Sequence, residues 1–276
     1  RVAGARSVST WRQAFGPDEV IQRVRPRETN AYIDNPHRGT TTFQRFNGDP
    51  LFPGLMWNDK DGPTEFGPFG GNLDNPRYPN TTISYCRWVW NVIEPEKGKF
   101  RWDIIEGALN AARLRGQTLQ VRIQPFVGDT IPEWYWALGA TKDEAASKPG
   151  YRVPDHNDPL YVKHWSSLIR AFGKRFDGHP DLESFDIAYG GACGEMGGNT
   201  TKKNAVKLAQ VYMNAFRKTQ LITMLETDGG TYAAARDRRI GWRGDCYGDV
   251  RTHGRNVVPE GLNWRHMYDC YPKAVA

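Results

Sequence analysis

One acidic residue stands apart in the stretch DIAYGGACGEMGGN, residues 186–199: Glu195 follows an apolar run and is surrounded by small residues. A carboxylic acid at the exit of a strand can exchange a proton with a bound substrate, as a general acid or base does. The glycines beside it would let a substrate approach the backbone closely, because they carry no Cβ. Glu195 is therefore the candidate catalytic residue, and the alternative is a polar side chain in a surface loop.

Further residues of the types that bind sugars fall at the ends of apolar segments. Carboxylates and arginines can hold sugar hydroxyls, and aromatic rings can stack on the apolar faces of pyranose rings. The candidates for substrate binding are Arg87, Trp90, Arg122, Gln124, Trp134, Tyr189, Glu226, Arg243 and Asp245. With Glu195 they predict a glycosidase-like site, in which two carboxyl groups flank the bond that is cleaved.

Most of these residues also have a structural explanation. Arg87 and Arg122 lie within apolar segments, where a lone buried cation is costly, so each should have a carboxylate partner inside the fold. A purely structural ion pair would meet the same need. Glu226 and Asp245 could bind sugar hydroxyls or cap the helices that follow them. Trp134, within IPEWYWALG, could be a stacking platform or a hydrophobic plug, and the sequence leaves these alternatives open.

The clearest strand among the elements that would position these residues is TLQVRIQPF, residues 118–126. Apolar and polar residues alternate in it, as they do in a strand with one buried face. The apolar face would carry Leu119, Val121 and Ile123, and the polar face would carry Gln120, Arg122 and Gln124. This pattern predicts a polar row that faces a ligand or the inside of a barrel.

Strands and helices alternate along the rest of the chain. DPLYVKHWSSLIRAFGKRF, residues 158–176, predicts an amphipathic helix with Asp158 as its N-cap and Pro159 at its first position. The other predicted strands are 38–46, 81–93, 182–190, 220–228 and 239–249, and the other predicted helices are 101–117, 201–219, 230–238 and 262–271. Long loops are expected over 47–80 and 127–157.

Such an alternation predicts βα units on a parallel sheet. Six strands are counted, whereas a (β/α)8 TIM barrel has eight, so the prediction is an α/β TIM barrel truncated after about six βα units. A leader over 1–36 would precede a barrel domain over 37–276 that lacks the C-terminal part of the barrel. The alternative is a smaller open α/β sheet. No GxGxxG or GxxxxGK[ST] motif follows a strand, which weakens a nucleotide-binding version.

Composition and spacing argue against several other classes. The formal net charge is +6, but the basic residues are scattered, so we expect no nucleic-acid partner. No apolar stretch approaches the roughly 20 residues of a membrane span. The six His show no HxH or HExxH spacing and the four Cys no CxxC spacing, so no metal or other cofactor is expected. No signal peptide is visible, yet we expect an extracellular or periplasmic location.

Three segments resemble a known family. YCRWVWNVIEPEKGKFRWDIIEGALNAARLRGQTLQVRI (85–123) is similar to the second-strand and third-strand region of retaining (β/α)8 glycoside hydrolases of the β-galactosidase-like, family 42-like branch. NPHRGTT (35–41) resembles their first-strand entry, and DIAYGGACGEMG (186–197) resembles the fourth-strand end that carries their acid/base. The resemblance covers roughly residues 35–250, and EPEKGKFRWD is its most specific block.

The resemblance implies roles for two residues. Glu195 matches the acid/base, and Arg87 matches the second-strand arginine that orients the nucleophile. Gly194 stands where many relatives have Asn, so the hydrogen bond to the sugar 2-hydroxyl would come from elsewhere. The nucleophile of the family is a Glu at the end of the seventh strand; no segment matches it, so we expect it beyond Ala276, and Glu226 does not take its place.

We therefore expect a retaining glycoside hydrolase that cleaves β-linked, galactose-containing glycans by double displacement, with an oligo- or polysaccharide as its partner. The positive net charge makes a sulfated galactan such as a carrageenan a candidate substrate. The alternative is a non-catalytic glycan-binding barrel that lost its nucleophile.

Overall fold

The computed structural model describes residues 40–49, 61–74, 79–195, 199–224, 227–237 and 239–243. Within these ranges six strands form one sheet, and every strand lies parallel to the next. The strands are β1 (Thr42–Phe43), β2 (Ile83–Val89), β3 (Thr118–Gln124), β4 (Leu182–Ile187), β5 (Gln220–Met224) and β6 (Gly241–Arg243). Their order across the sheet is their order along the chain, so the reversal that marks a doubly wound sheet is absent from this part of the structure.

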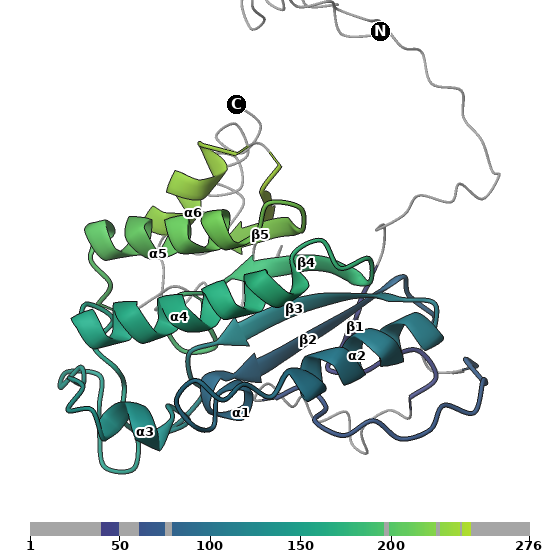
Figure 1. Ribbon diagram of the computed structural model, residues 1–276, viewed down its shortest axis with the longest axis horizontal. Coiled ribbons are helices and arrows are strands. Elements are labelled where there is room, and N and C mark those ends of the chain that lie inside the picture. Colours follow the sequence, from purple (N-terminus) through teal and green to yellow (C-terminus); the bar gives the residue numbers. More distant parts are fainter. Residues whose placement is uncertain are drawn as a thin grey trace, which may run out of the picture. The chain divides into compact units, whose positions relative to one another are not determined.

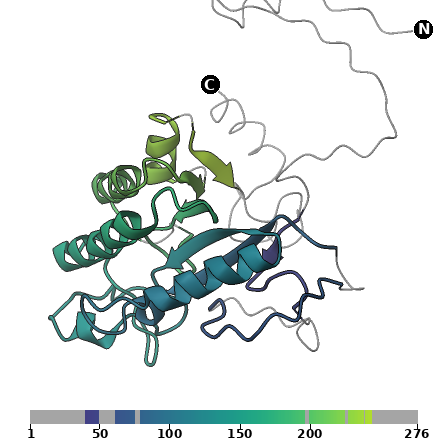
Figure 2. The ribbon, with the colours of Figure 1, turned by 45° about the vertical axis from the view of Figure 1, so that its right-hand side comes forward.

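Helices connect the successive strands. They are α1 (Trp90–Ile93), α2 (Trp102–Leu114), α3 (Glu133–Trp136), α4 (Pro159–Phe176), α5 (Lys202–Ala215) and α6 (Asp228–Ala234). Figures 1 and 2 show α2, α4 and α5 along the same face of the sheet. A parallel sheet wound in one direction with its helices on one face is the wall of a (β/α) barrel. The described residues thus form a curled α/β half-barrel, and the predicted fold class is confirmed.

The helix α4 shows how local sequence sets the bounds of an element. The side chain of Asp158 accepts a hydrogen bond from the Leu160 backbone N–H at 2.7 Å. Pro159 takes the first helical position, where no N–H is needed. Near its C-terminal end α4 approaches α5 closely, because a Cβ added to Gly173 would lie 2.4 Å from the carbonyl oxygen of Ala215. The predicted helix and its N-cap are confirmed.

Other predicted bounds differ from the structure. The first predicted strand, 38–46, contributes only the two residues of β1 to the sheet. The helix predicted over 201–219 ends at Ala215, since the next residue, Phe216, is already extended. Within the predicted loop 127–157, the structure forms α3, which buries Tyr135. Outside the described residues lie the predicted leader 1–36, part of the last predicted strand (244–249) and the helix predicted over 262–271.

The two faces of the sheet differ in chemistry. One register row, formed by Cys86, Val121, Phe185 and Leu221, is apolar and lies in the hydrophobic core. Trp165 and Phe172 of α4 pack in the same core. The neighbouring row, formed by Tyr85, Gln120, Ser184 and Gln220, projects from the opposite face and is polar. The polar side chains at the carboxyl ends of the strands therefore lie on the face away from the helical core.

Candidate active site

We call this polar face the inner face; its described residues include Tyr85, Arg87, Gln120, Arg122, Gln124, Ser184, Asp186 and Arg243. Arg87 lies in register with Arg122, and residues in register on parallel strands project to the same side. On β3, the residues that alternate with Gln120, Arg122 and Gln124 are Leu119, Val121 and Ile123, and these are fully buried in the core. The predicted division of β3 into an apolar and a polar face is confirmed.

A buried carboxylate joins two of the predicted arginines. Asp186 is wholly buried, and its Oδ2 accepts hydrogen bonds from Arg122 Nε at 2.7 Å and from Arg243 Nε at 2.9 Å. Burial acts to lower the pKa of Arg122, but the charge of Asp186 opposes this and the pKa is raised overall. Arg122 stays cationic, and the interior carboxylate that the sequence predicted for it is Asp186.

Tyr85 lies between the two arginines of β2 and β3. The guanidinium carbon of Arg122 lies 5.6 Å from the centre of the Tyr85 ring, and that of Arg87 lies 5.9 Å from it. Arg87 also lies 4.7 Å from the centre of the Phe43 ring. Burial raises the pKa of Tyr85, so its hydroxyl keeps its proton. These cation–π contacts stabilise both guanidinium groups on the inner face.

Glu195 follows β4 and lies beside Arg122. The loop that carries it turns back to the end of β3, because Cys193 N–H donates to Phe126 O (3.0 Å) and Arg122 Nη1 donates to Cys193 O (2.9 Å). Glu195 Oε1 lies 3.9 Å from Arg122 Nη1, and the Glu195 side chain is 45% exposed. A half-exposed carboxylate beside a fixed guanidinium is accessible to a ligand and can exchange a proton with it. The structure thus places Glu195 where the sequence predicted, and its catalytic role stays a prediction.

The backbone before Glu195 requires a glycine. Cys193 and Gly194 both have positive φ values, 57° and 70°. A Cβ added to Gly194 would lie 2.7 Å from Ala188 Cβ, closer than real Cβ contacts come. Position 194 therefore has neither the space nor the backbone conformation for a side chain that binds sugar.

Two predicted substrate-binding residues lie in the core instead, which corrects the prediction. Trp90 is fully buried, and its Nε1 donates to Glu94 Oε2 at 2.8 Å. It begins α1, so its ring enters the helical layer, where rings of four other residues surround it: Trp134, Tyr135, Tyr161 and Trp165. Tyr189 is 1% exposed and its hydroxyl accepts the N–H of Gly229. Neither ring presents a face to a sugar.

Trp134 and Gln124 are placed less decisively. Trp134 is half-buried, packs edge-on against Trp90 at 5.6 Å and donates its Nε1 hydrogen to Glu94 O. This arrangement resembles the hydrophobic plug more than the stacking platform. Gln124 is buried on the inner face, and its Cα lies near Gly194. Two further predicted binding residues, Glu226 and Asp245, lie outside the described residues.

Three residues of this region were missed by the sequence reasoning. Asp186 and Tyr85 share the alternation of their strands with Ser184 and Arg87, so period-two patterning could have found them. His156, which precedes α4, contacts the loop that carries Glu195 through Gly191 N–H. No sequence signal marked it, because that contact joins residues 35 positions apart.

The described part of the chain contains no group of three or more His, Cys, Asp or Glu side chains that could hold a metal ion. Within the same residues, no helix is both long and apolar enough to cross a membrane.

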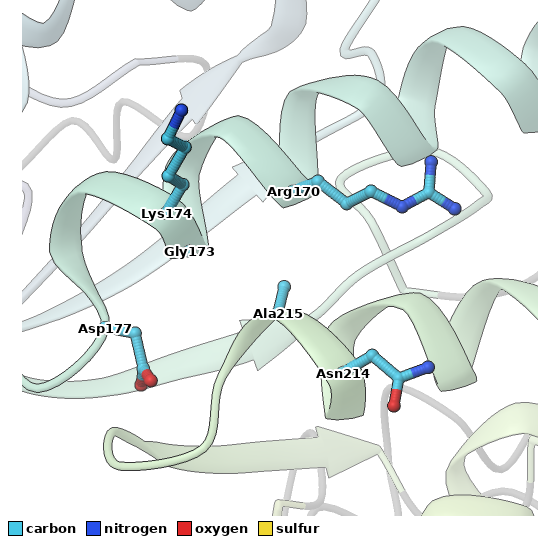
Figure 3. Close-up of a pocket in the computed structure, with 6 residues that line it drawn as sticks. All are labelled: Arg170, Gly173, Lys174, Asp177, Asn214 and Ala215. Carbon is cyan, nitrogen blue, oxygen red and sulfur yellow. The ribbon is translucent and has the colours of Figure 1, made fainter.

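A surface hollow of about 480 Å³ lies between α4 and α5, away from the inner face. It is lined by Arg170, Gly173, Lys174, Asp177, Asn214 and Ala215. Figure 3 shows that the Arg170 and Lys174 side chains extend in different directions. The Asp177 carboxylate accepts backbone N–H groups of the turn before β5. The hollow thus lacks converging polar groups, and the candidate site remains on the inner face.

Comparisons with known proteins found matches among solved structures only; no family model and no curated protein matches the chain. The chain is similar to endo-glycoceramidase II from Rhodococcus sp., described as a lactosyl-enzyme intermediate, with 14% identity over 52% of this chain and 41% of that protein, at a TM-score of 0.37. It is also similar to GH5_18 from Streptomyces cattleya in complex with GlcNAc, with 15% identity over 56% of this chain and 40% of that protein, at a TM-score of 0.38. Both are glycoside hydrolases, and each match spans about two fifths of the other protein's length.

Proposed function

We propose that this chain forms part of the active site of a retaining glycoside hydrolase, with Glu195 as the general acid/base. The observation that carries the proposal is the position of Glu195 at the carboxyl end of a barrel strand, half-exposed and 3.9 Å from Arg122 Nη1. Active sites of (β/α) barrels form at this end of the strands. A carboxyl group that must both give and take a proton has to be accessible to substrate and water, as Glu195 is.

In the proposed mechanism, Glu195 protonates the oxygen of the leaving group and then removes a proton from the attacking water. A second carboxylate forms the covalent glycosyl-enzyme, at about 5–5.5 Å from the first in retaining enzymes. Asp186 is unsuited to this role, because it is wholly buried and its Oδ2 already accepts two guanidinium hydrogen bonds. The nucleophile would come from a part of the barrel that the described residues do not include, and Arg87 would orient it.

The proposed substrate is a β-linked, galactose-containing glycan of the kind that family 42-like enzymes cleave. More specifically, we propose a sulfated galactan. Among the described residues, the charged groups that we place on this side are three guanidinium groups and two carboxylates: Arg87, Arg122, Arg243, Asp186 and Glu195. The excess of one positive charge among these groups would favour an anionic substituent on the sugar. Extracellular or periplasmic action on a polysaccharide fits such a substrate.

The test is made on the full-length protein, with the part of the barrel that is expected to supply the nucleophile. It compares wild type, Glu195→Gln and Glu106→Gln on neutral and sulfated β-galactans, with reducing-end release and glycan binding measured in parallel. Glu106 is the matched control, since it is an exposed glutamate of α2 paired with Arg175 outside the site. We expect Glu195→Gln to lower turnover by about 10²–10⁴-fold while binding stays within a few-fold of wild type. Glu106→Gln should behave as wild type.

Other outcomes separate the alternatives. If Glu195→Gln cleaves as fast as wild type, Glu195 is not the acid/base. If the wild type binds galactans but cleaves none of them, the chain is the non-catalytic glycan-binding barrel. If it cleaves other β-glycans only, the class of reaction holds and the galactan specificity is wrong.

A further inference from the structure

A buried histidine contacts the segment that leads to Glu195. His156 is 1% exposed and precedes α4, and its Nε2 accepts the backbone N–H of Gly191 at 3.1 Å. Its other ring nitrogen, Nδ1, lies 3.2 Å from Asn199 Oδ1. His156 thus bonds to residues that lie before and after Glu195 in the chain.

These two bonds determine the state of the imidazole. An N–H group can only donate, so Nε2 must present its lone pair to Gly191 and cannot carry a proton. Nδ1 then carries the single ring proton and donates it to Asn199 Oδ1. The structure therefore requires neutral His156 in its Nδ1–H tautomer.

Gly191 is the corner of the turn that presents Glu195. The carbonyl oxygen of Gly191 accepts the N–H of Gly194 at 3.2 Å, while its own N–H goes to His156. The His156 ring packs closely against Gly190, because a Cβ added to Gly190 would lie 3.1 Å from His156 Cδ2. On the other side of the imidazole lies Tyr161, whose ring centre is 4.8 Å from the centre of the His156 ring. The imidazole is thus enclosed between α4 and the turn.

We propose that neutral His156 is a positioning residue that fixes the turn carrying Glu195, and that protonation of His156 releases this turn in acid. A proton on Nε2 would set two donors against each other, so the Gly191 N–H would lose the acceptor that His156 provides and the turn would move. Since residues 191–195 also set the contact between Glu195 and Arg122, the release would change the position of Glu195.

The groups around His156 define the direction of the response. Burial lowers the pKa of His156 from its ordinary value of 6.5, while Asn199 and the charges of Asp155 and Asp143 act in the opposite direction. Tyr161 of α4 is buried with a raised pKa and stays neutral. The stabilisation by the neutral ring is therefore complete above pH 6.5 and is lost as the pH falls through the lowered pKa.

The experiment follows backbone hydrogen exchange of residues 190–195 from about pH 8 to about pH 4, in wild type, His156→Gln and His164→Gln. Gln keeps an acceptor oxygen for the Gly191 N–H but does not titrate in this range. His164 is the matched control, since it is also a buried histidine of this region but packs against Trp134 instead of the turn. Comparison at equal pH removes the intrinsic pH dependence of exchange.

We expect exchange in wild type and His164→Gln to become about tenfold faster than in His156→Gln at the acid end, and to match it within about twofold at pH 8. In parallel, ¹⁵N NMR of wild-type imidazoles should show His156 unprotonated at Nε2 at neutral pH. Equal acid response in His156→Gln, or an Nε2–H tautomer, would overturn the proposal. Both readouts need no substrate, so this inference can fail or hold independently of the proposed glycosidase activity.

Discussion

The junction at Asp186 allows a quantitative prediction for the substitution Asp186→Asn. The change keeps the shape of the side chain but removes the charge that two buried guanidinium groups share. Asp186 is completely buried, and the side chains of Arg122 and Arg243 are only 3% and 14% exposed. Removal of one partner from such a buried pair costs about 3–5 kcal/mol, because the two cations lose the buried counter-charge that they share.

We therefore expect Asp186→Asn to lower the free energy of unfolding by about 3–5 kcal/mol and Tm by roughly 6 to 20 °C. Urea unfolding followed by tryptophan fluorescence and by far-UV circular dichroism measures the first quantity, and a thermal melt measures the second. The m value should stay the same, since the surface buried by the fold is unchanged.

Two comparisons make the experiment decisive. Asp237→Asn removes a carboxylate from an exposed pair, with Asp237 27% and Arg239 68% exposed, and it should cost less than about 1 kcal/mol. The triple variant Arg122→Met, Asp186→Leu, Arg243→Met replaces all three charged side chains of the junction by apolar groups and should be more stable than Asp186→Asn. If Asp186→Asn loses less than about 1 kcal/mol, the carboxylate does not hold the two arginines as described.

Three further predictions concern other parts of the fold. Gly194→Ala should lower Tm more than Gly116→Ala does. Both glycines have φ near +70°, which alone costs an alanine about 1–2 kcal/mol, but only at Gly194 would the added Cβ meet a neighbour, Ala188 Cβ at 2.7 Å. Equal decreases in Tm for the two variants would contradict the close contact. Trp90→Ala should lower the free energy of urea unfolding by about 3–5 kcal/mol, as for a core aromatic residue. A loss below about 1 kcal/mol would contradict the burial of the Trp90 ring in the core. Burial raises the pKa of Glu94 above its ordinary value of 4.5, so the stability associated with its protonated form is lost as the pH rises from 4.5 through the raised pKa. Glu94→Gln should therefore flatten this part of the curve of Tm against pH, and parallel curves for wild type and Glu94→Gln would refute the reasoning.

The sequence predicted the elements well where periodicity alone decides the structure. β3 alternates strictly, and α4 combines an amphipathic pattern with a capping Asp158 and Pro159. Both features are local, so a single sequence suffices to recognise them. The loop before Glu195 was also recognisable, since its glycines indicate positive φ or close approach.

Residues at the exits of strands were harder to assign. Trp90 directly follows β2, but the chain turns there into α1 and carries the ring into the core. Alternation along β4 could have placed Asp186 on the polar face, but its role as a shared carboxylate depends on the register between β3 and β4 and on the reach of Arg243 past β5. These contacts join residues 64 and 57 positions apart, and the pattern within one strand contains no information about them.

The shared carboxylate has a consequence for synthesis of the chain on the ribosome. Arg122, Asp186 and Arg243 emerge in that order, separated by 64 and 57 residues. At about 5–20 residues per second, each interval lasts roughly 3 to 13 seconds. Arg122 must remain hydrated until Asp186 has emerged, whereupon a neutral pair can enter the interior. Arg243 then binds to an Asp186 that is already paired with Arg122. The strand β6 can therefore join the sheet late, because Asp186 has a counter-charge before Arg243 arrives.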